Sequence, residues 1–130
     1  MKEPVWLLKS TIIATHEAAI AENGGFSGFR DERLFDSALA RPVNLFAYEL
    51  CDIFDLAAAY AFGIVKNHAF LDGNKRTGFL ATRVFLLRNG YTITASREDK
   101  IDVFVKLASS IISEKMFTQW LRDNSEPLTR

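Results

Sequence analysis

The stretch from about Cys51 to Asn67 reads CDIFDLAAAYAFGIVKN and is apolar on nearly every side. It is followed at once by the polar stretch His68–Thr77, which reads HAFLDGNKRT. A helix that is apolar all round is buried, so the first stretch predicts a helix at the centre of the fold. Polar residues held by such a scaffold form a loop, which is a common position for functional residues. We therefore expect one buried central helix that ends in a chemically rich loop.

Further helices are predicted on both sides of this centre. A helical pattern follows Ser10 and ends at Asn23, and Asp31 opens a second helix that Pro42 is expected to stop. Beyond the loop, helices are expected over about 74–89, 98–110 and 113–122, with one strand-like stretch at 91–94. Residues 124–130 are expected to be frayed. The pattern predicts a mainly α, compact bundle of about six helices with at most one short strand or hairpin.

Length and composition limit the class of protein. The chain has 130 residues and a mass of 14.7 kDa, which suits one domain over residues 1–130, with its core at about 5–122. Eleven Phe and an apolar share of 48% supply a real core and exclude a disordered chain. Lys+Arg and Asp+Glu are both 16, so no global positive field attracts nucleic acid or an acidic membrane. The single Cys51 excludes a disulfide framework and a cysteine-based zinc site within one chain.

The sequence carries no recognisable targeting or membrane-spanning segment. Its first residues, MKEP, are too polar for a secretory signal. No apolar run reaches the ~18 residues that a membrane helix needs. We therefore expect a cytoplasmic protein with no membrane partner and no direct nucleic-acid partner.

Gly73 stands where the polar loop becomes the next helix. A glycine at this position lets successive backbone N–H groups point into one concavity, and with the helix N-terminus they form an anion site. Lys75 and Arg76 add two cations in the first turn, where positive charge is unfavourable unless an anion is bound. Asn74 is expected to cap the helix or to reach a phosphate, and Thr77 belongs to the same candidate site.

The local balance of charge supports an anion site. Between Lys66 and Arg88 the chain has five basic residues and one acidic residue. Arg76 and Arg83 are seven positions apart and so share a helix face. Lys66 and Arg83 are therefore further candidates for phosphate binding, although either could be an ordinary exposed charge. This local excess in a neutral chain indicates a phosphate binder rather than a general nucleic-acid binder.

Asp72 is the one acidic residue of the loop. Mg²⁺ binds one or two carboxylates together with phosphate oxygens, so Asp72 is the candidate metal ligand, with an ion pair to Lys75 or Arg76 as the alternative. His68 lies four residues earlier, and an imidazole suits the removal of a proton from a hydroxyl. A base, a metal carboxylate and a phosphate site are the parts that phosphoryl transfer needs. His16 has no such neighbours in the sequence and is expected to be a packing or hydrogen-bonding residue.

The stretch HAFLDGNKRT resembles the motif of the Fic/Doc superfamily, whose broad form is H-P-F-x-(D/E)-G-N-(G/K)-R. It is most similar to the Doc branch, the death-on-curing toxins of toxin–antitoxin modules. Gly24-Gly25, Arg30-Asp31, the stretch SALARP at 37–42 and Tyr48-Glu49 also resemble the N-terminal half of Doc proteins. The resemblance covers roughly residues 5–122 and implies a Fic/Doc-like helical domain with the active loop between two central helices.

The resemblance also implies a role for each matched residue. His68 would be the general base, Asp72 would bind Mg²⁺, and Phe70 would be the buried anchor of the loop. The phosphates of ATP would be held by Gly73, Asn74, Lys75 and Arg76.

Three positions depart from the pattern of Fic adenylyltransferases. Lys75 replaces their usual glycine, and Phe79 stands where they have a second arginine. Both positions belong to the nucleotide-phosphate site of the family, so these changes argue against the usual transfer of AMP. Ala69 replaces a proline, which loosens the loop without removing chemistry. Lys75 is the Doc-like choice, and the Doc branch is associated with phosphorylation of a protein hydroxyl by ATP.

The resemblance therefore implies a toxin that transfers the γ-phosphoryl group of ATP to a Ser or Thr hydroxyl of a host translation protein and so arrests growth. Elongation factor Tu is the target that it suggests, and the segment Arg41–Glu49 is the candidate for contact with the host protein. The inhibitory helix motif of many Fic proteins, S/T-x-x-x-E-(G/N), is not matched, so a separate, small, Phd-like and partly disordered antitoxin is the expected partner.

Two alternatives stay open at this point. The same loop could transfer the adenylyl group of ATP. The domain could also be non-catalytic and only bind a nucleotide or a partner.

Overall fold

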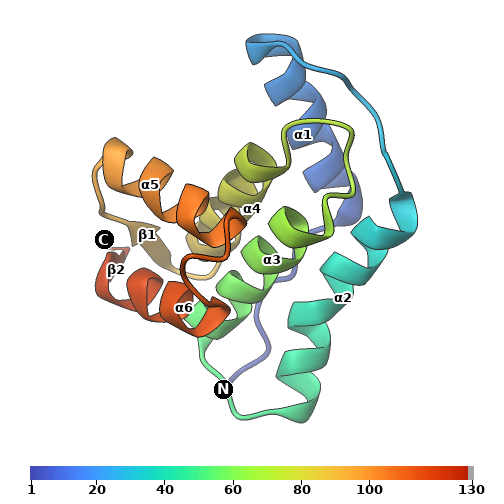
Figure 1. Ribbon diagram of the computed structural model, residues 1–130. Helices are drawn as coiled ribbons and strands as arrows, with labels where there is room; N and C mark the ends of the chain where they lie inside the picture. Colours follow the sequence, from blue (N-terminus) through green and yellow to red (C-terminus); the bar gives the residue numbers. More distant parts are fainter. Residues whose placement is uncertain (129–130) are drawn as a thin grey trace.

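The computed structural model describes residues 1–128, which form six helices and one two-stranded antiparallel sheet (Figure 1). These described residues confirm the prediction of a mainly α, single-domain bundle. The elements, in chain order, are α1 (Lys9–Asn23), α2 (Glu32–Tyr48), α3 (Ile53–Asn67), α4 (Asn74–Arg88), β1 (Tyr91–Ile93), α5 (Arg97–Ala108), α6 (Glu114–Asp123) and β2 (Ser125–Pro127).

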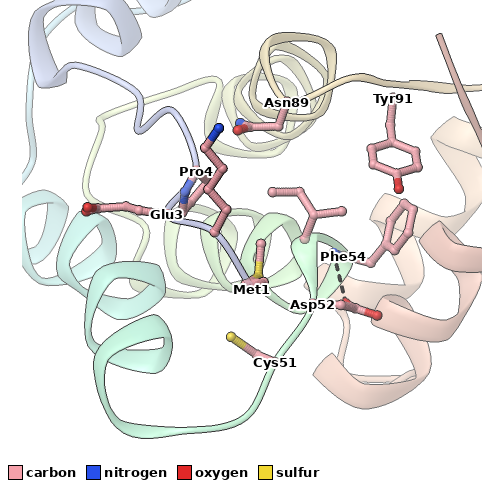
Figure 2. A pocket seen from close by; sticks show the side chains of 10 residues that line it. Met1, Glu3, Pro4, Cys51, Asp52, Phe54, Asn89 and Tyr91 are labelled. Carbon is pink, nitrogen blue, oxygen red and sulfur yellow. Dashed lines mark hydrogen bonds between the residues drawn. The ribbon is translucent and has the colours of Figure 1, made fainter. Parts of the chain in front are cut away.

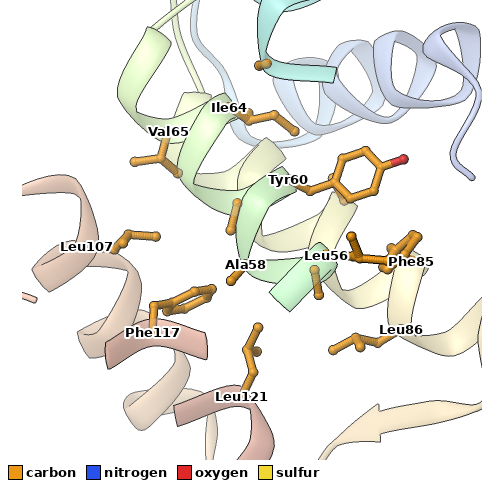
Figure 3. Close-up of a cluster of buried hydrophobic side chains, with 14 of the residues drawn as sticks. Leu56, Ala58, Tyr60, Ile64, Val65, Phe85, Leu86, Leu107, Phe117 and Leu121 are labelled. Atoms are coloured by element: carbon orange, nitrogen blue, oxygen red, sulfur yellow. The ribbon is translucent and has the colours of Figure 1, made fainter. Parts of the chain in front are cut away.

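Helix α3 lies at the centre of the molecule and contacts α2, α4, α5 and α6. Figure 3 shows its side chains meeting Phe85 and Leu86 of α4 on one side and Phe117 of α6 on another. Eleven of its 15 residues are buried, as the apolar pattern predicted. Burial of one large apolar side chain stabilises a fold by about 1.5–3 kcal/mol, so the packing of α3 contributes strongly to the stability of the structure. The loop that follows it therefore starts from a fixed position.

Helix α2 continues through Pro42 to Tyr48, so the prediction that Pro42 ends this helix is wrong. Proline leaves the carbonyl group four residues earlier, that of Ala38, without its helical donor. Ala38 packs so closely on α3 that a Cβ atom on Gly63 would lie 3.2 Å from its carbonyl oxygen. Pro42, Phe35 and Ala38 are all buried. Burial of this face against α3 therefore outweighs the loss of one helical hydrogen bond.

Side-chain caps precede α2, α3, α5 and α6, whereas α1 and α4 have none. Asp31, Asp52 and Ser113 each accept hydrogen bonds from backbone N–H groups of the helices that they precede. Helix α1 begins at Lys9, before the expected Ser10, because the carbonyl oxygen of Leu8 already accepts from Thr11 and Ile12. These caps satisfy donors that the first turn of a helix leaves without helical partners.

The C-terminal segment is ordered further than expected. Ser125–Pro127 form β2 and pair antiparallel with Tyr91–Ile93, so the expectation of a frayed end is wrong for these residues. The pairing is extended by Thr94, whose N–H donates to Asn124, and by Leu128, whose N–H donates to Gly90. Residues 129–130, which were included in that expectation, lie outside the described part of the chain.

None of the helices within residues 1–128 is long and apolar enough to cross a lipid bilayer.

Candidate active site

The polar loop connects the C-terminal end of α3 to the N-terminal end of α4, beside α1 and the connection between α1 and α2 (Figure 1). His68 ends α3 in the left-handed conformation, with φ 54°, and Gly73 precedes α4 with φ 75°. A left-handed residue at each end turns the chain twice within six residues. The residues between these turns are thereby held in a compact arc.

Phe70 anchors the middle of this arc, as the resemblance implied. Its side chain is 1% exposed and stacks on the ring of His16, with 3.7 Å between the ring centroids. The ring of Phe29 also stacks on the ring of Phe70, with 4.9 Å between the centroids, and the centroid of the Phe35 ring lies 5.0 Å from that of Phe70. Aromatic packing of this kind adds to the stabilisation that burial already provides. The buried ring of Phe70 therefore anchors the loop in the apolar interior, beneath the polar groups that the loop exposes.

Asn74 ties the two ends of the arc together and is itself buried. Its side-chain oxygen accepts from the N–H of Phe70 at 3.1 Å, and its side-chain nitrogen donates to the carbonyl oxygen of Phe70 at 3.0 Å. This amide therefore closes the loop and does not cap α4, so the expectation of a helix cap is wrong. A contact of Asn74 with phosphate stays a prediction.

His68 presents an exposed imidazole at the start of the loop. The side-chain nitrogen of Asn74 lies 3.1 Å from Nδ1 of this ring. Because the two bonds to Phe70 fix which end of the Asn74 amide is the nitrogen, Asn74 donates and Nδ1 accepts. The hydrogen of the neutral ring is accordingly assigned to Nε2.

Arg30 holds the backbone beneath His68, although Arg30 lies 38 residues earlier. Its Nε donates to the carbonyl oxygen of His68 at 2.8 Å, and its Nη2 donates to that of Asn67 at 3.0 Å. The last carbonyl groups of a helix lack helical partners, so this guanidinium caps α3 at the point where the loop leaves it.

Asp72 exposes its carboxylate on the same arc. Its Oδ1 accepts from the N–H of Gly73 at 2.9 Å, and its Oδ2 accepts a longer bond of 3.4 Å from the N–H of Phe26. A Cβ atom on Gly25, which has φ 114°, would lie 2.7 Å from Oδ2. The segment between α1 and α2 therefore approaches Asp72 at a distance that only glycine permits.

The N-terminus of α4 is open to solvent next to this carboxylate. The first helical bond runs from Thr77 to Gly73, so the N–H groups of Asn74, Lys75 and Arg76 have no helical partners. Within residues 1–128, no side chain caps α4, and its first turn contains no acidic residue. Lys75 and Arg76 are exposed there and make no ion pair with any described residue. Free amides, a helix N-terminus and two cations form a site for an anion such as phosphate.

The structure does not bring every predicted residue to this surface. Thr77 is fully buried, and its hydroxyl oxygen is buried with it. Lys66 donates to Ser110 and, at 3.3 Å, to the carbonyl oxygen of Ala108, which engages its ammonium at the end of α5. Arg83 is exposed two turns further along α4. Phosphate binding by these three residues stays a prediction.

The oxygen ligands that the loop offers fit Mg²⁺ only together with a nucleotide. Within residues 1–128, no group of three or more His, Cys, Asp or Glu side chains could hold a metal ion. Mg²⁺ keeps several waters and needs only one or two carboxylates when phosphate oxygens complete its shell. The exposed Asp72 beside the anion site meets that requirement.

A hollow of about 500 Å³ lies away from this loop, at the opposite ends of α3 and α4. Figure 2 shows it between Pro4, Asn89, Tyr91 and Cys51. Burial and three nearby acidic groups raise the pKa of the Cys51 thiol, with burial as the largest cause. A raised pKa lowers the fraction of the nucleophilic thiolate at neutral pH.

The fold and the site together define a small helical domain that presents a histidine and a carboxylate beside an uncapped helix N-terminus. A comparison with family models agrees, because the model of the Fic/DOC family matches residues 6–86, from the approach to α1 to the last turn of α4. The chain belongs to the Fic/DOC family.

Two relatives refine this assignment. The chain is 34% identical over 112 residues to a protein of Escherichia phage P1 named Protein kinase doc, and the aligned region covers 85% of this chain and 88% of that protein. It is 41% identical over 76 residues to a protein of Mycolicibacterium smegmatis named Toxin Doc, and the aligned region covers 55% of this chain and 57% of that protein. The resemblance to the Doc branch is therefore confirmed.

Sequence reasoning identified the loop but not the residues that hold it from outside. Arg30 was noted only within a similar stretch, and His16 was predicted to pack or to form hydrogen bonds, which is confirmed. The contact of Gly25 with Asp72 was not predicted at all. The one available signal was the cluster of glycines at 24, 25 and 28, since glycine often marks a close approach of the backbone.

Proposed function

We propose that this chain is a Doc-type toxin that transfers the γ-phosphoryl group of ATP to a Ser or Thr hydroxyl of a host translation protein. The observation that carries the proposal is the placement of exposed His68 and Asp72 beside the open N-terminus of α4, with Lys75 and Arg76 in its first turn. The names of the two relatives, one a protein kinase and the other a toxin, support it. By the same resemblance, elongation factor Tu is the proposed target.

The N-terminus of α4 is the proposed phosphate site. The amides that follow Gly73 would donate to phosphate oxygens, while Lys75 and Arg76 would supply fixed positive charge. Asp72 would hold Mg²⁺, which when bound would neutralise charge that develops on the phosphates. Because Asp72 already accepts from Gly73, its carboxylate is oriented before a ligand arrives.

The transfer itself forms one O–P bond and breaks another. The substrate hydroxyl bonds to the γ-phosphorus, its proton goes to His68, and the bond from the γ-phosphorus to the bridging oxygen breaks to release ADP. In this structure Asn74 donates to Nδ1 of His68 at 3.1 Å, so the hydroxyl can reach a basic nitrogen only after this bond opens or the ring turns. A single neutral hydrogen bond contributes about 1 kcal/mol net, so an exposed ring can make this change at low cost.

The same proposal includes a partner and a compartment. A Doc-type toxin implies a cognate antitoxin, which we expect to be small, Phd-like and partly disordered. Because the reaction consumes ATP and acts on a translation protein, we expect it in the cytoplasm.

Induced expression in bacteria tests this function. We expect the wild-type chain to arrest growth and protein synthesis, and His68→Asn to leave both unchanged while accumulating to the same level. Asn is the chosen replacement because, apart from glycine, it is among the residues that best tolerate the left-handed conformation of position 68. Arg88→Ala, at the far end of α4, is the control and should arrest growth like the wild type. Growth arrest that persists with His68→Asn would instead indicate a domain that acts by binding alone.

A further inference from the structure

His16 lies in the middle of α1 and reaches the active loop from outside the motif. Its side chain is 1% exposed, and its Nε2 lies 2.8 Å from the carbonyl oxygen of Asp72. A carbonyl oxygen can only accept, so Nε2 of His16 carries a hydrogen and donates it. None of the steps proposed above uses this buried donor.

The bond acts on a peptide group that the active site uses from its other side. The carbonyl group of Asp72 and the N–H of Gly73 belong to one planar trans peptide and point in opposite directions. That N–H donates to Oδ1 of Asp72 at 2.9 Å. A bond that fixes the carbonyl oxygen on the α1 side therefore also fixes the N–H that orients the carboxylate.

Helix α1 also closes the space behind Gly73. A Cβ atom on Gly73 would lie 3.2 Å from Cδ1 of Ile20 and 3.6 Å from Nε2 of His16. Besides its hydrogen bond, the His16 ring stacks on Phe70 with 11° between the planes. The side chain of His16 thus contacts both Phe70, which anchors the loop, and the turn at Asp72–Gly73 that precedes α4.

We propose that His16 is a positioning residue, whose Nε2–H sets the plane of the Asp72–Gly73 peptide and through it the direction of the Asp72 carboxylate and of the Gly73 amide. This inference rests on the proposed function for its effect on catalysis. It predicts that loss of the donor, with the stacked ring kept, weakens binding of magnesium-ATP before it weakens the fold.

The test compares two replacements of the same residue. His16→Phe keeps a flat ring for Phe70 and removes the donor, whereas His16→Gln keeps a donor and loses the ring. We expect His16→Phe to raise the KM for magnesium-ATP and the calorimetric dissociation constant by roughly tenfold, which is the size of effect that the loss of about one oriented hydrogen bond has on binding. His16→Gln should recover a measurable part of that affinity. A purely structural role would lower the unfolding temperature of both variants without moving either constant.

Two readouts that do not depend on activity keep the inference testable if His16→Phe fails to fold. In wild-type protein, nuclear magnetic resonance should detect a slowly exchanging Nε2 proton on His16. In folded His16→Gln, the amide resonances of Gly73 and Asn74 should stay close to their wild-type positions. A fast-exchanging Nε2 proton, or a folded His16→Phe with wild-type affinity and KM, would overturn the inference. If the wild type itself transfers no phosphoryl group, the proposed function fails, while the proton and the ATP affinity still decide the role of His16.

Discussion

Arg30 donates from Nε to the carbonyl oxygen of His68 over 2.8 Å, although the two residues belong to different connections of the fold. The same guanidinium donates to the carbonyl oxygen of Asn67 at 3.0 Å. The backbone N–H groups of Arg30 and Asp31 donate in turn to the carbonyl oxygen of Ala69. The segment before α2 therefore lies against the start of the active loop and holds the conformation from which His68 projects.

Replacement of this guanidinium tests that support. We expect Arg30→Ala to lower kcat for protein phosphorylation by roughly ten- to a hundredfold, because His68 loses the backbone position that aims it. Arg30→Lys should recover little, since an ammonium lacks the planar fork that reaches two carbonyl oxygens. Arg33→Ala is the matched control, because Arg33 has a side chain 91% exposed and pairs only with Asp31 among the described residues. Steady-state kinetics with circular dichroism of each variant would decide it, and a wild-type kcat in folded Arg30→Ala would remove the role.

The two cations of the first turn of α4 should act on nucleotide binding. We expect Lys75→Ala and Arg76→Ala each to weaken ATP binding by about tenfold, in line with the loss of one charge-assisted hydrogen bond. Arg88→Ala serves as the control, because it removes the same charge from the last turn of the same helix. Isothermal titration with magnesium-ATP measures the effect. Wild-type affinity for magnesium-ATP in Lys75→Ala and Arg76→Ala, as in the control Arg88→Ala, would show that the anion site lies elsewhere.

Alanine substitutions at Gly25 and at Gly28 distinguish the effect of a close contact with Asp72 from the effect of backbone strain. Both have positive φ, 114° and 96°, so alanine is strained at either position. A Cβ atom at Gly25 would lie 2.7 Å from Oδ2 of Asp72, whereas nothing lies within 4 Å of a Cβ at Gly28. We therefore expect Gly25→Ala to raise the Mg²⁺ concentration needed for half-maximal activity severalfold more than Gly28→Ala. A magnesium titration at fixed ATP measures this difference, and identical titration curves would contradict the contact.

Asp52 is expected to make stability depend on pH. Burial acts to raise the pKa of this carboxyl, but bonds from the Asp55 backbone and from Arg122 outweigh burial and hold the pKa below its usual 3.8. Because the folded state lowers the pKa, the stabilisation is present above pH 3.8 and is lost as the pH falls through the folded value. Asp52→Ala should cost about 1 kcal/mol at neutral pH, the usual cost of losing a helix cap.

The control for this prediction is Asp52→Asn, which keeps the cap of α3 and cannot ionise. Urea unfolding over a range of pH would show the wild type losing its advantage over Asp52→Asn as the solution is acidified. A difference between these two proteins that grows toward low pH would contradict the account.

Much of the fold and of the loop follows from local patterns. The all-round apolar stretch of α3 and the glycine at the start of α4 are signals that a single sequence carries, and both were found where expected. The buried position of Phe70 was implied by the resemblance to the Fic/Doc motif, and it depends on contacts with His16, Phe29 and Phe35 from other segments. The apolar pattern of α3 and the position of Gly73, in contrast, are local features of the sequence.

The remaining features depend on which segments meet in space. Pro42 stays helical because Ala38 packs on Gly63 of another helix, and Ser125–Pro127 become a strand only because Tyr91–Ile93 offer an edge. Long-range partners such as these leave no periodic trace in the sequence.

The central claim, transfer of the γ-phosphoryl group by the loop between α3 and α4, is tested most directly with labelled ATP. The purified chain is incubated with a bacterial extract and ATP labelled at either the α- or the γ-phosphate, with His68→Asn alongside. We predict that one host protein acquires label from the γ-phosphate alone and that His68→Asn removes this label. Transfer of the α-phosphate would contradict the claim and assign the chain to adenylyl transfer. The extract is made from a bacterium whose growth the expressed chain arrests. Transfer of neither label in that extract would contradict the claim and indicate a binding domain.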